Sequence, residues 1–318
     1  MDFTLLSRLS SQHFVSGQEL AEEAGCTRAA IAKRVAALRE AGVLVEARSR
    51  HGYRLLHPYD WWSAQALQAR GARSHEIHVL PAIDSTNLWM RTQLQGLSPG
   101  AMLTAVTDFQ RAGRGRRGRQ WLSLPGRQIT VSWGCCSASA PFVWLGAALA
   151  VGVEVAEVLR AQGWPVQLKW PNDLWLDGRK LGGILVEMDA MAEGPTRLVI
   201  GLGINEHVLP EEAASLGREV AALSDCTHSW DRHQLLLLLD ERVRALLQTF
   251  PVAGLSAWHA RWSRLDALAG QAVRFEQDGV WHEGVAAGID AQGALQVRLA
   301  NGHLHVCHAG EVSVRPQS

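Results

Sequence analysis

Residues 110–119 form the most unusual segment of the sequence, because five arginines alternate there with three glycines. Guanidinium groups bind carboxylate and phosphate oxygens with paired hydrogen bonds, and glycines let the backbone approach a bound anion closely. Gly113, Gly115 and Gly118 also match the G-x-G-x-x-G dinucleotide fingerprint, but that fingerprint must open a helix and Pro125 follows too soon for one. We therefore expect an anion-binding loop, and a solvated basic surface loop is the alternative.

A second group of chemically capable residues contains two of the few lysines. Residues 169–173 read Lys-Trp-Pro-Asn-Asp, and residues 179–183 read Arg-Lys-Leu-Gly-Gly. Of 31 Lys and Arg residues, only Lys33, Lys169 and Lys180 are lysines. A lysine ammonium is a compact point charge that fits against one oxygen, whereas a guanidinium is larger and prefers two. Two lysines beside an amide and a carboxylate favour a phosphate or carboxylate site, and coincidence is the alternative.

Two weaker motifs complete the set. Residues 83–88 (Ile-Asp-Ser-Thr-Asn-Leu) place three small polar side chains at the expected start of a helix, where an ordinary helix cap also explains them. Residues 201–205 (Gly-Leu-Gly-Ile-Asn) leave a strand through a lone G-x-G, which carries little information by itself.

The first sixty residues are typical of a winged helix-turn-helix. Ser16 and Thr27 each have the sequence context of a helix N-cap, and strand-like runs at 43–45 and 53–56 flank a turn. The polar side of the second helix and the hairpin would contact DNA. A helical interaction unit without DNA is the alternative. The residues expected to bind DNA are Arg28, Lys33, Arg34, Arg48 and Arg50.

The remaining chain predicts two further domains, so that the fold class is multidomain α+β. Residues 61–267 predict a mixed α/β domain, and 268–318 predict a small SH3-like β-barrel because five short apolar runs alternate with turn residues. In the middle domain, we expect strands at 101–106, 129–133, 167–170, 183–187 and 198–202, and helices at 145–161 and 234–250.

Composition excludes several classes of protein. Among 318 residues, 31 basic and 31 acidic side chains balance, which argues against a basic nucleic-acid coat or an acidic tail. Five cysteines without a C-x-x-C pair argue against a disulfide scaffold or a zinc ribbon. We expect no signal peptide, because residues 1–6 show no basic leader followed by a long apolar stretch, and no apolar run reaches the roughly 18 residues of a membrane span. We expect a soluble, cytoplasmic protein that does not bind a membrane.

Taken together and in this order, the four motifs resemble those of the biotin–protein ligases. The winged helix indicates the bifunctional bacterial type, which is also a repressor of the biotin operon. The resemblance covers nearly the whole chain, and its most specific parts are Gly-Arg-Gly-Arg-Arg-Gly at 113–118 and Lys-Trp-Pro-Asn-Asp at 169–173.

The resemblance implies a ligase that uses ATP, biotin and Mg²⁺. Biotin would first become biotinyl-5′-AMP with release of pyrophosphate, and a lysine of the biotin carboxyl carrier protein of acetyl-CoA carboxylase would then accept the biotin. It also implies binding to operator DNA and a homodimer promoted by biotinyl-5′-AMP. Both steps gather negative charge on phosphoryl or carbonyl oxygens, so fixed cations and amides are the expected catalytic groups.

Site residues follow from the matching motif positions. The resemblance implies catalytic roles for Lys180, Arg116 and Asp173, with Asp173 also holding the metal. It implies biotin contacts from Ser85, Thr86, Asn87, Gln110, Arg114, Gly115, Arg116, Lys180 and Gly183. It implies adenylate contacts from Gly113, Arg117, Trp121, Lys169, Asn172 and Asn205, with Gly203 nearby.

Two other functions remain alternatives. A biotin-sensing repressor without ligase activity would keep the pocket and lose catalysis, but the retention of Lys180, Arg116 and Asp173 argues against it. A lipoate–protein ligase shares the catalytic fold, but its arginine–glycine motif differs and is followed by a His-Asp signature. Here Trp121 follows the motif and no histidine is near it.

Overall fold

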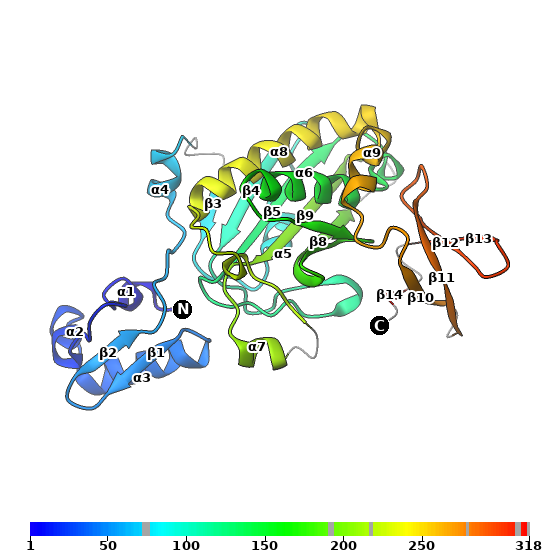
Figure 1. Ribbon diagram of the computed structural model, residues 1–318. Coiled ribbons are helices and arrows are strands. Elements are labelled where there is room, and N and C mark those ends of the chain that lie inside the picture. The colour runs from blue at the N-terminus through cyan, green and yellow to red at the C-terminus, as the bar shows by residue number, and fades with distance from the viewer. Residues whose placement is uncertain (72–76, 190–193, 216–218, 278–279, 309–312, 317–318) are drawn as a thin grey trace.

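The computed structural model describes the chain except residues 72–76, 190–193, 216–218, 278–279, 309–312 and 317–318. Three units follow one another from the N-terminus to the C-terminus: a small helical unit with a hairpin, a large domain around a seven-stranded sheet, and a second sheet (Figure 1).

The N-terminal unit is a winged helix-turn-helix, as the sequence predicts. Ser16 Oγ accepts a hydrogen bond from the Gln18 amide, and Thr27 Oγ1 accepts one from the Ala30 amide, so both expected caps are present. The first strand of the hairpin begins at Val45, two residues later than expected, and the Leu44 amide before it donates to the Tyr59 hydroxyl. The elements are α1 (Phe3–Leu6), α2 (Gly17–Glu23), α3 (Arg28–Glu40), β1 (Val45–Arg48) and β2 (Gly52–Leu55).

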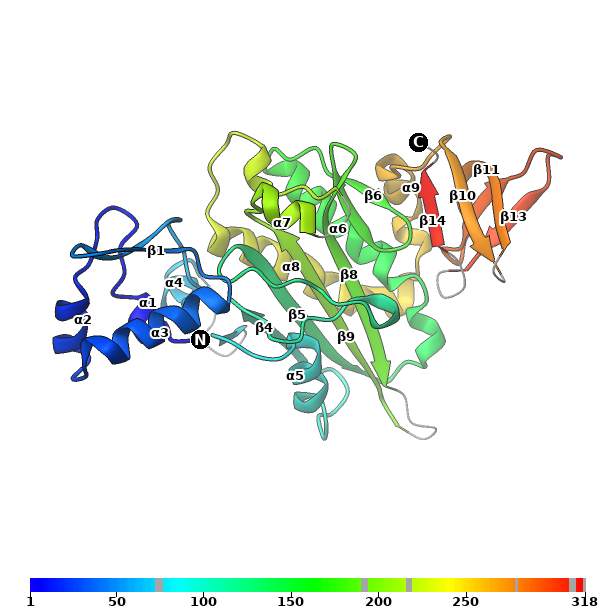
Figure 2. The same ribbon diagram turned by 90° about the horizontal axis from the view of Figure 1, so that it is seen from below.

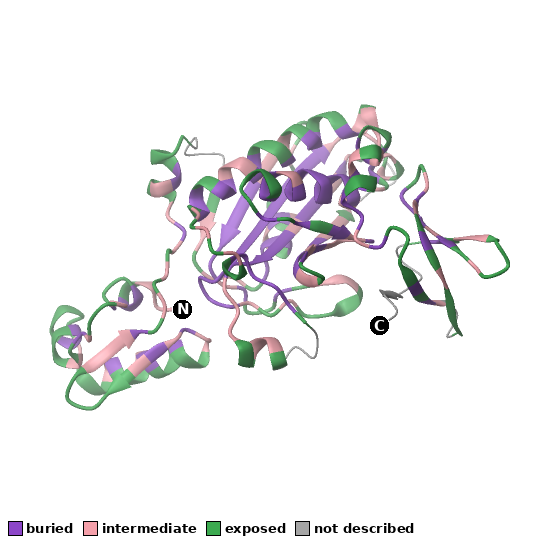
Figure 3. Cartoon of the chain, viewed as in Figure 1, coloured by how far each residue is buried: buried purple, intermediate pink, exposed green. Residues whose placement is uncertain are grey.

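The central sheet has the strand order β3-β4-β5-β9-β8-β7-β6. β3 and β4 are parallel, and every other neighbouring pair is antiparallel. The longest strands lie in the middle, where both faces are covered and most residues are buried (Figure 3). The strands are β3 (Ile77–Leu80), β4 (Met102–Thr107), β5 (Gln128–Ser137), β6 (Gln167–Lys169), β7 (Asp173–Leu176), β8 (Arg179–Asp189) and β9 (Thr196–Asn205).

Helices cover the two faces of this sheet unequally, as Figures 1 and 2 show. Side chains alternate between faces along a strand. Trp133 of β5 faces the main core with α6 and α8, whereas the neighbouring Ser132 faces α5. Thus α5 packs on the face that carries the polar residues of β5. The helices are α4 (Ala64–Ala69), α5 (Thr86–Gln93), α6 (Ala147–Ala161), α7 (Pro210–Ser215), α8 (Arg232–Ala253) and α9 (Ser256–Leu265).

Among the residues that the structure describes, one helical stretch, 141–161, is long and apolar enough by length and composition to cross a membrane, with a mean hydropathy of 1.9. It contains α6, and 67% of the stretch is buried inside the protein. Because α6 packs against the sheet, α8 and α9, its apolar surface belongs to the core.

The C-terminal unit is a five-stranded antiparallel sheet in the order β13-β12-β11-β10-β14. The expected SH3-like barrel is not confirmed. A barrel needs a ladder between its edge strands, and among the described residues β13 and β14 do not pair. The strands are β10 (Ala272–Gln277), β11 (Val280–Ile289), β12 (Leu295–Arg298), β13 (Leu304–Cys307) and β14 (Ser313–Pro316).

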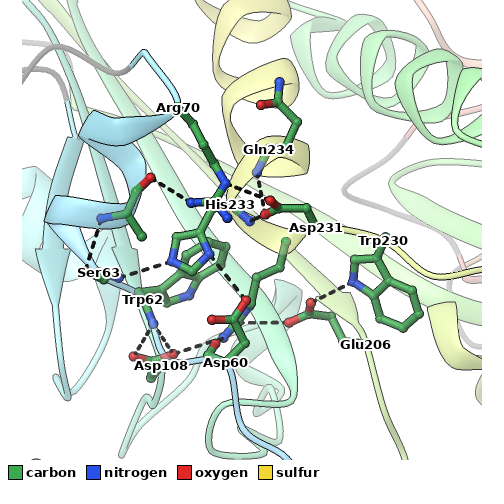
Figure 4. A network of polar contacts seen from close by, with 12 residues as sticks. Asp60, Trp62, Ser63, Arg70, Asp108, Glu206, Trp230, Asp231, His233 and Gln234 are labelled. Carbon is green, nitrogen blue, oxygen red and sulfur yellow. Dashed lines mark hydrogen bonds and ion pairs between the residues drawn. The ribbon is translucent and has the colours of Figure 1, made fainter.

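A network of polar contacts around Asp60, Trp62 and Asp108 holds the linker between the N-terminal unit and the central domain (Figure 4). Arg232, at the start of α8, forms ion pairs with Asp108 at 3.3 Å and with Glu206 at 2.9 Å, and donates to the Asp60 carbonyl. Its guanidinium also lies 4.0 Å from the centre of the Trp62 ring. Burial raises the pKa of Asp108 to about 7, and the Arg232 charge opposes that rise. Linker residues 60–62 are therefore held by α8 and by the chain after β4.

A second contact joins the winged helix directly to the central domain. Arg127, whose side chain is 1% exposed, forms a bidentate ion pair with Glu212 of α7. Its guanidinium also reaches the Gly42 carbonyl, just after α3. Close by, the His57 and His207 rings lie 4.3 Å apart.

The pH dependence of stability tests this junction. Burial, followed by the charges of His207 and Arg127, lowers the pKa of His57 to about 4. A lowered folded-state pKa gives stability that is present above the unfolded value of 6.5 and is lost as the pH falls toward 4. We expect the melting temperature to fall less between pH 7 and pH 5 in His57→Gln than in the wild type.

The control is His13→Gln, which changes an exposed histidine of the same unit. It should show the wild-type fall. An equal fall in all three proteins would mean that protonation of His57 does not oppose folding.

Candidate functional site

Two adjoining cavities lie beside the middle of the central sheet. The larger has a volume of about 590 Å³, and the smaller is a narrow slot of about 40 Å³. Residues shared by both linings make them continuous: Arg114, Trp121, Gly183 and Leu185. One site is therefore formed by residues 110–119, called the Arg-Gly loop below, together with the β7–β8 hairpin and the start of α5, as expected from the motifs.

The slot is lined by neutral polar groups at the start of α5. Ser85 is the helix N-cap, and its hydroxyl accepts from the Leu88 amide. The Thr86 amide and hydroxyl both donate to Gln110 Oε1, at 2.8 and 3.1 Å. Helix capping and the site therefore use the same segment, so the cap interpretation and the binding interpretation of this motif are compatible.

Ser132 of β5 was missed at the sequence level. Its hydroxyl lies 2.7 Å from Thr86 Oγ1 and 2.6 Å from Asn87 Oδ1. The signal was present in the strand 129–133, where Thr130 and Ser132 put hydroxyls at alternating positions of an otherwise apolar strand. Without the register of β5 against α5, those hydroxyls had no assigned neighbour.

The weak glycine motif of β9 has a steric reason. A Cβ added at Gly201 would lie 2.3 Å from Asn87 Oδ1, and one at Gly203 would lie 2.5 Å from the Trp121 ring. Side chains at either position would push Asn87 or Trp121 out of place. The two glycines therefore form the floor on which the slot residues rest.

The large cavity is strongly cationic. Four arginines of the loop and two lysines line it, against the carboxylates of Asp173 and Glu219. Arg116 donates to Asn172 Oδ1 at 3.0 Å, and burial together with the Arg117 charge lowers the pKa of Arg116. The cationic lining residues are Arg114, Arg116, Arg117, Arg119, Lys169 and Lys180.

A tight hairpin positions Lys180 and Asp173. Between β7 and β8 only Asp177 and Gly178 form the turn, and both have positive φ, at 50° and 75°, which a two-residue hairpin turn requires. A register shift follows, so that Lys180 Nζ meets Asp173 Oδ1 at 2.5 Å. A Cβ at Gly183 would lie 3.3 Å from the Lys180 Nζ, so the glycine leaves room for the ammonium.

Of three further residues expected to contact the adenylate, one lines the large cavity and two line neither cavity. Lys169 Nζ lies 4.6 Å from the centre of the Trp175 ring, on the cavity wall. Gly113 packs against the Trp121 backbone rather than lining a cavity. Asn205 is buried and also lines neither cavity, because its amide group bonds to Gln128 and to the Ala221 carbonyl.

Glu187 is a further residue that sequence reasoning missed. It lies on β8 beyond Gly183 and Leu185, on the same face of the strand. Its carboxylate forms an ion pair with Arg114 at 3.0 Å and accepts a hydrogen bond from Asn87 at 2.8 Å. The motif ends at the glycines before it, so nothing in the sequence linked Glu187 to the loop.

The expected DNA-binding residues lie on the winged helix. Arg28 and Lys33 are exposed on α3, and Arg48 and Arg50 are exposed on the hairpin. Arg34 is partly buried and forms an ion pair with Asp2, so its charge is partly compensated. Together they place cations on both the second helix and the wing.

Comparisons with known proteins agree with this arrangement. Residues 79–205 match the biotin/lipoate A/B protein ligase family, residues 2–54 match an HTH domain, and residues 269–315 match the biotin protein ligase C-terminal domain. The chain is 36% identical to the bifunctional ligase/repressor BirA of Salmonella typhimurium, over 98% of this chain and 97% of that protein. The corresponding protein of Escherichia coli is 35% identical over 98% and 96%.

The solved structure of biotin protein ligase from Aquifex aeolicus in complex with biotin and ATP is also similar. It has a TM-score of 0.62 and 26% identity, covering 76% of this chain and 99% of that one. With its HTH, ligase and C-terminal domains, and with this similarity along nearly its whole length, the chain belongs to the biotin protein ligase family and to the BirA-type bifunctional ligase/repressors within it.

Proposed function

We propose that this chain is an ATP-dependent biotin–protein ligase that also acts as a biotin-responsive repressor of biotin synthesis genes. The observation that carries the proposal is the continuity of a neutral, hydrogen-bonding slot with a larger cationic cavity. A ligand with a neutral ring at one end and a phosphate at the other fits such a site. We assign DNA binding, ligation and the C-terminal unit to residues 1–60, 61–267 and 268–318.

In the slot, the ureido ring of biotin would exchange hydrogen bonds with hydroxyls and amides. Such a ring has both donors and acceptors and no charge, which suits Ser85, Thr86, Asn87 and Gln110. Arg114, Gly115 and Gly183 would cover the valeryl chain where the slot opens into the cavity.

In the large cavity, the adenylate would meet the cations. A biotin carboxylate oxygen attacks the α-phosphorus of ATP, a C–O–P anhydride forms, and the bond to pyrophosphate breaks. Arg116 and Lys180 line this cavity and would face the junction where that charge develops, and Arg117, Lys169 and Asn172 would hold the nucleotide side. Trp121 would stack on adenine, and Gly113 and Asn205 would act by shaping the loop and the strand end.

In the second step, a lysine amine of the carrier protein attacks the anhydride carbonyl, AMP leaves, and the amine loses one proton. Of the two carboxylates that line the cavity, Asp173 would accept this proton, since its partner Lys180 would turn toward the phosphate. We propose the biotin carboxyl carrier protein of acetyl-CoA carboxylase as the acceptor.

Magnesium fits this donor set only in partnership with the nucleotide. In the described part of the chain, no three His, Cys, Asp or Glu side chains converge to hold a metal. Mg²⁺ is commonly held by one or two carboxylates plus phosphate oxygens of the substrate. The Asp173 carboxylate in the large cavity could be one such ligand, and the phosphates of ATP would supply the others. When bound, Mg²⁺ would neutralise phosphate charge.

Pyrophosphate release tests the function directly. The full chain with ATP, Mg²⁺ and biotin should release pyrophosphate, and lipoate in place of biotin should not support release. No release with biotin would favour a sensor without catalysis, and release with lipoate alone would favour a lipoate ligase. The relatives and the C-terminal domain match are those of biotin ligases.

Replacing Lys180 by arginine should abolish most of this activity. The ammonium is confined between Asp173 and Gly183, and a guanidinium there is too large to present one donor to one oxygen. We expect pyrophosphate release to fall about 100-fold or more, the cost of losing one fixed donor to a developing negative charge. Lys33→Arg, on the winged helix, is the control and should keep wild-type activity. Activity of Lys180→Arg within a few-fold of wild type would remove Lys180 from the catalytic role.

The direct contacts to DNA should come from the winged helix. The double variant Arg28→Ala/Lys33→Ala removes two exposed cations of α3, and the salt dependence of binding should fall by about one unit of slope for each cation that bound a phosphate. We expect weaker binding to promoter DNA of the biotin synthesis genes and unchanged pyrophosphate release. Arg298→Ala, on the C-terminal sheet, is the control. If the intact protein does not bind that DNA in a biotin-dependent way, the repressor role is wrong.

Homodimer formation promoted by biotinyl-5′-AMP and a cytoplasmic location complete the proposal. Reciprocal linkage applies to the first: whatever makes the adenylate bind more tightly to the dimer must also favour the dimer.

A further inference from the structure

The carboxylate of Glu187 joins the two elements that enclose the slot. Its Oε1 lies 3.0 Å from Arg114 Nη2, and its Oε2 accepts a hydrogen bond from Asn87 Nδ2 at 2.8 Å. Arg114 belongs to the Arg-Gly loop, and Asn87 belongs to the first turn of α5. One side chain of β8 therefore links the loop to the helix across the slot opening.

Glu187 is well shielded from solvent, since its side chain is 17% exposed. A hydrogen bond to an ionised partner is stronger than one between neutral groups, and shielding reduces screening by salt. The loop also needs such a partner, because its arginines repel one another where they converge on the cavity. The shielded carboxylate of Glu187 offsets this repulsion for Arg114, the loop arginine with which it forms an ion pair.

The same carboxylate fixes the direction of the Asn87 amide. Asn87 Oδ1 lies 2.6 Å from the Ser132 hydroxyl, and its Nδ2 donates to Glu187. A reversed amide would place its oxygen against the carboxylate, which is repulsive, so only one orientation satisfies both neighbours. The Asn87 amide therefore has one fixed orientation in the slot, so the positions of its donor and its acceptor are defined.

The next acid on this face of β8 provides an internal comparison. Asp189 forms a bidentate ion pair with Arg91 of α5, at 2.9 and 2.8 Å. That pair also links β8 to α5, but the Asp189 side chain is 44% exposed and neither partner lines a cavity. An effect on the ligand site is therefore expected from Glu187 and not from Asp189.

We propose that Glu187 is a positioning residue for the ligase reaction, which holds Arg114 over the slot and orients Asn87 toward the ligand. The proposal rests on the proposed function, since the ligand in the slot is biotin. Glu187 would contact neither the biotin carboxylate nor the α-phosphate. Its loss should therefore weaken the binding of biotin and of biotinyl-5′-AMP more than it slows adenylate formation.

The test compares Glu187→Gln with Asp189→Asn in the full chain. Each variant keeps the shape of the side chain and removes its charge. In Glu187→Gln we expect the KM for biotin to rise and preformed biotinyl-5′-AMP to dissociate faster, each by about tenfold or more, the factor that corresponds to one charge-assisted hydrogen bond. The rate of adenylate formation at saturating biotin should change by no more than about a factor of three. Loss of one ordinary hydrogen bond in the transition state would change this rate by more than that. Asp189→Asn should match the wild type in all three measurements.

The partner side provides an independent measurement. In an Arg114→Met background, the further change Glu187→Gln should cost much less than it does alone, because the ion pair is already gone. Equal effects of Glu187→Gln and Asp189→Asn, full additivity with Arg114→Met, or a loss confined to the rate at saturating biotin would each overturn the proposal. If the wild type does not release pyrophosphate with biotin, the proposed function fails instead, so the two failures are distinguishable.

Discussion

Mutual repulsion among cations is the constraint on which the arrangement of this site depends. Four arginines and two lysines line one cavity, and like charges at such distances destabilise a fold unless each has a compensating neighbour. The protein distributes its few acids and amides accordingly: Asp173 for Lys180, Glu187 for Arg114, and the Asn172 amide for Arg116. Each compensating group comes from β7, from β8 or from the residue before β7, so this one hairpin supplies the partners of Lys180, Arg114 and Arg116.

That dependence explains why some of the site was predictable and some was not. The motifs at 113–118 and 169–173 concentrate charge within a few residues, so their chemistry could be inferred from the sequence. Glu187 and Ser132 both contact Asn87, which lies 100 residues before Glu187 and 45 residues before Ser132 in the sequence. Their role depends on strand register, and a register is set by the whole sheet rather than by local pattern.

The features of the fold also fall into those that local sequence predicts and those that it does not. Helix caps at Ser16 and Thr27 and the apolar period of α6 are local features, and the structure contains both where the sequence placed them. Closure of the C-terminal strands depends on pairing between distant edges, which spacing does not encode, and the expected barrel was not confirmed. Asn205 shows the same limit at one residue: the sequence places it at the end of a strand, but only the structure shows that its amide bonds to Gln128 and to the Ala221 carbonyl.

The segment from the Arg-Gly loop to β5 connects the two proposed activities through the backbone. It starts at the cavity with Arg114 and passes Trp121, which lines both the slot and the large cavity. Within six residues it reaches Arg127, which is buried against Glu212 and the Gly42 carbonyl of the winged helix. The wall of the ligand site and the contact with the winged helix are therefore only six residues apart along the same segment, at Trp121 and Arg127.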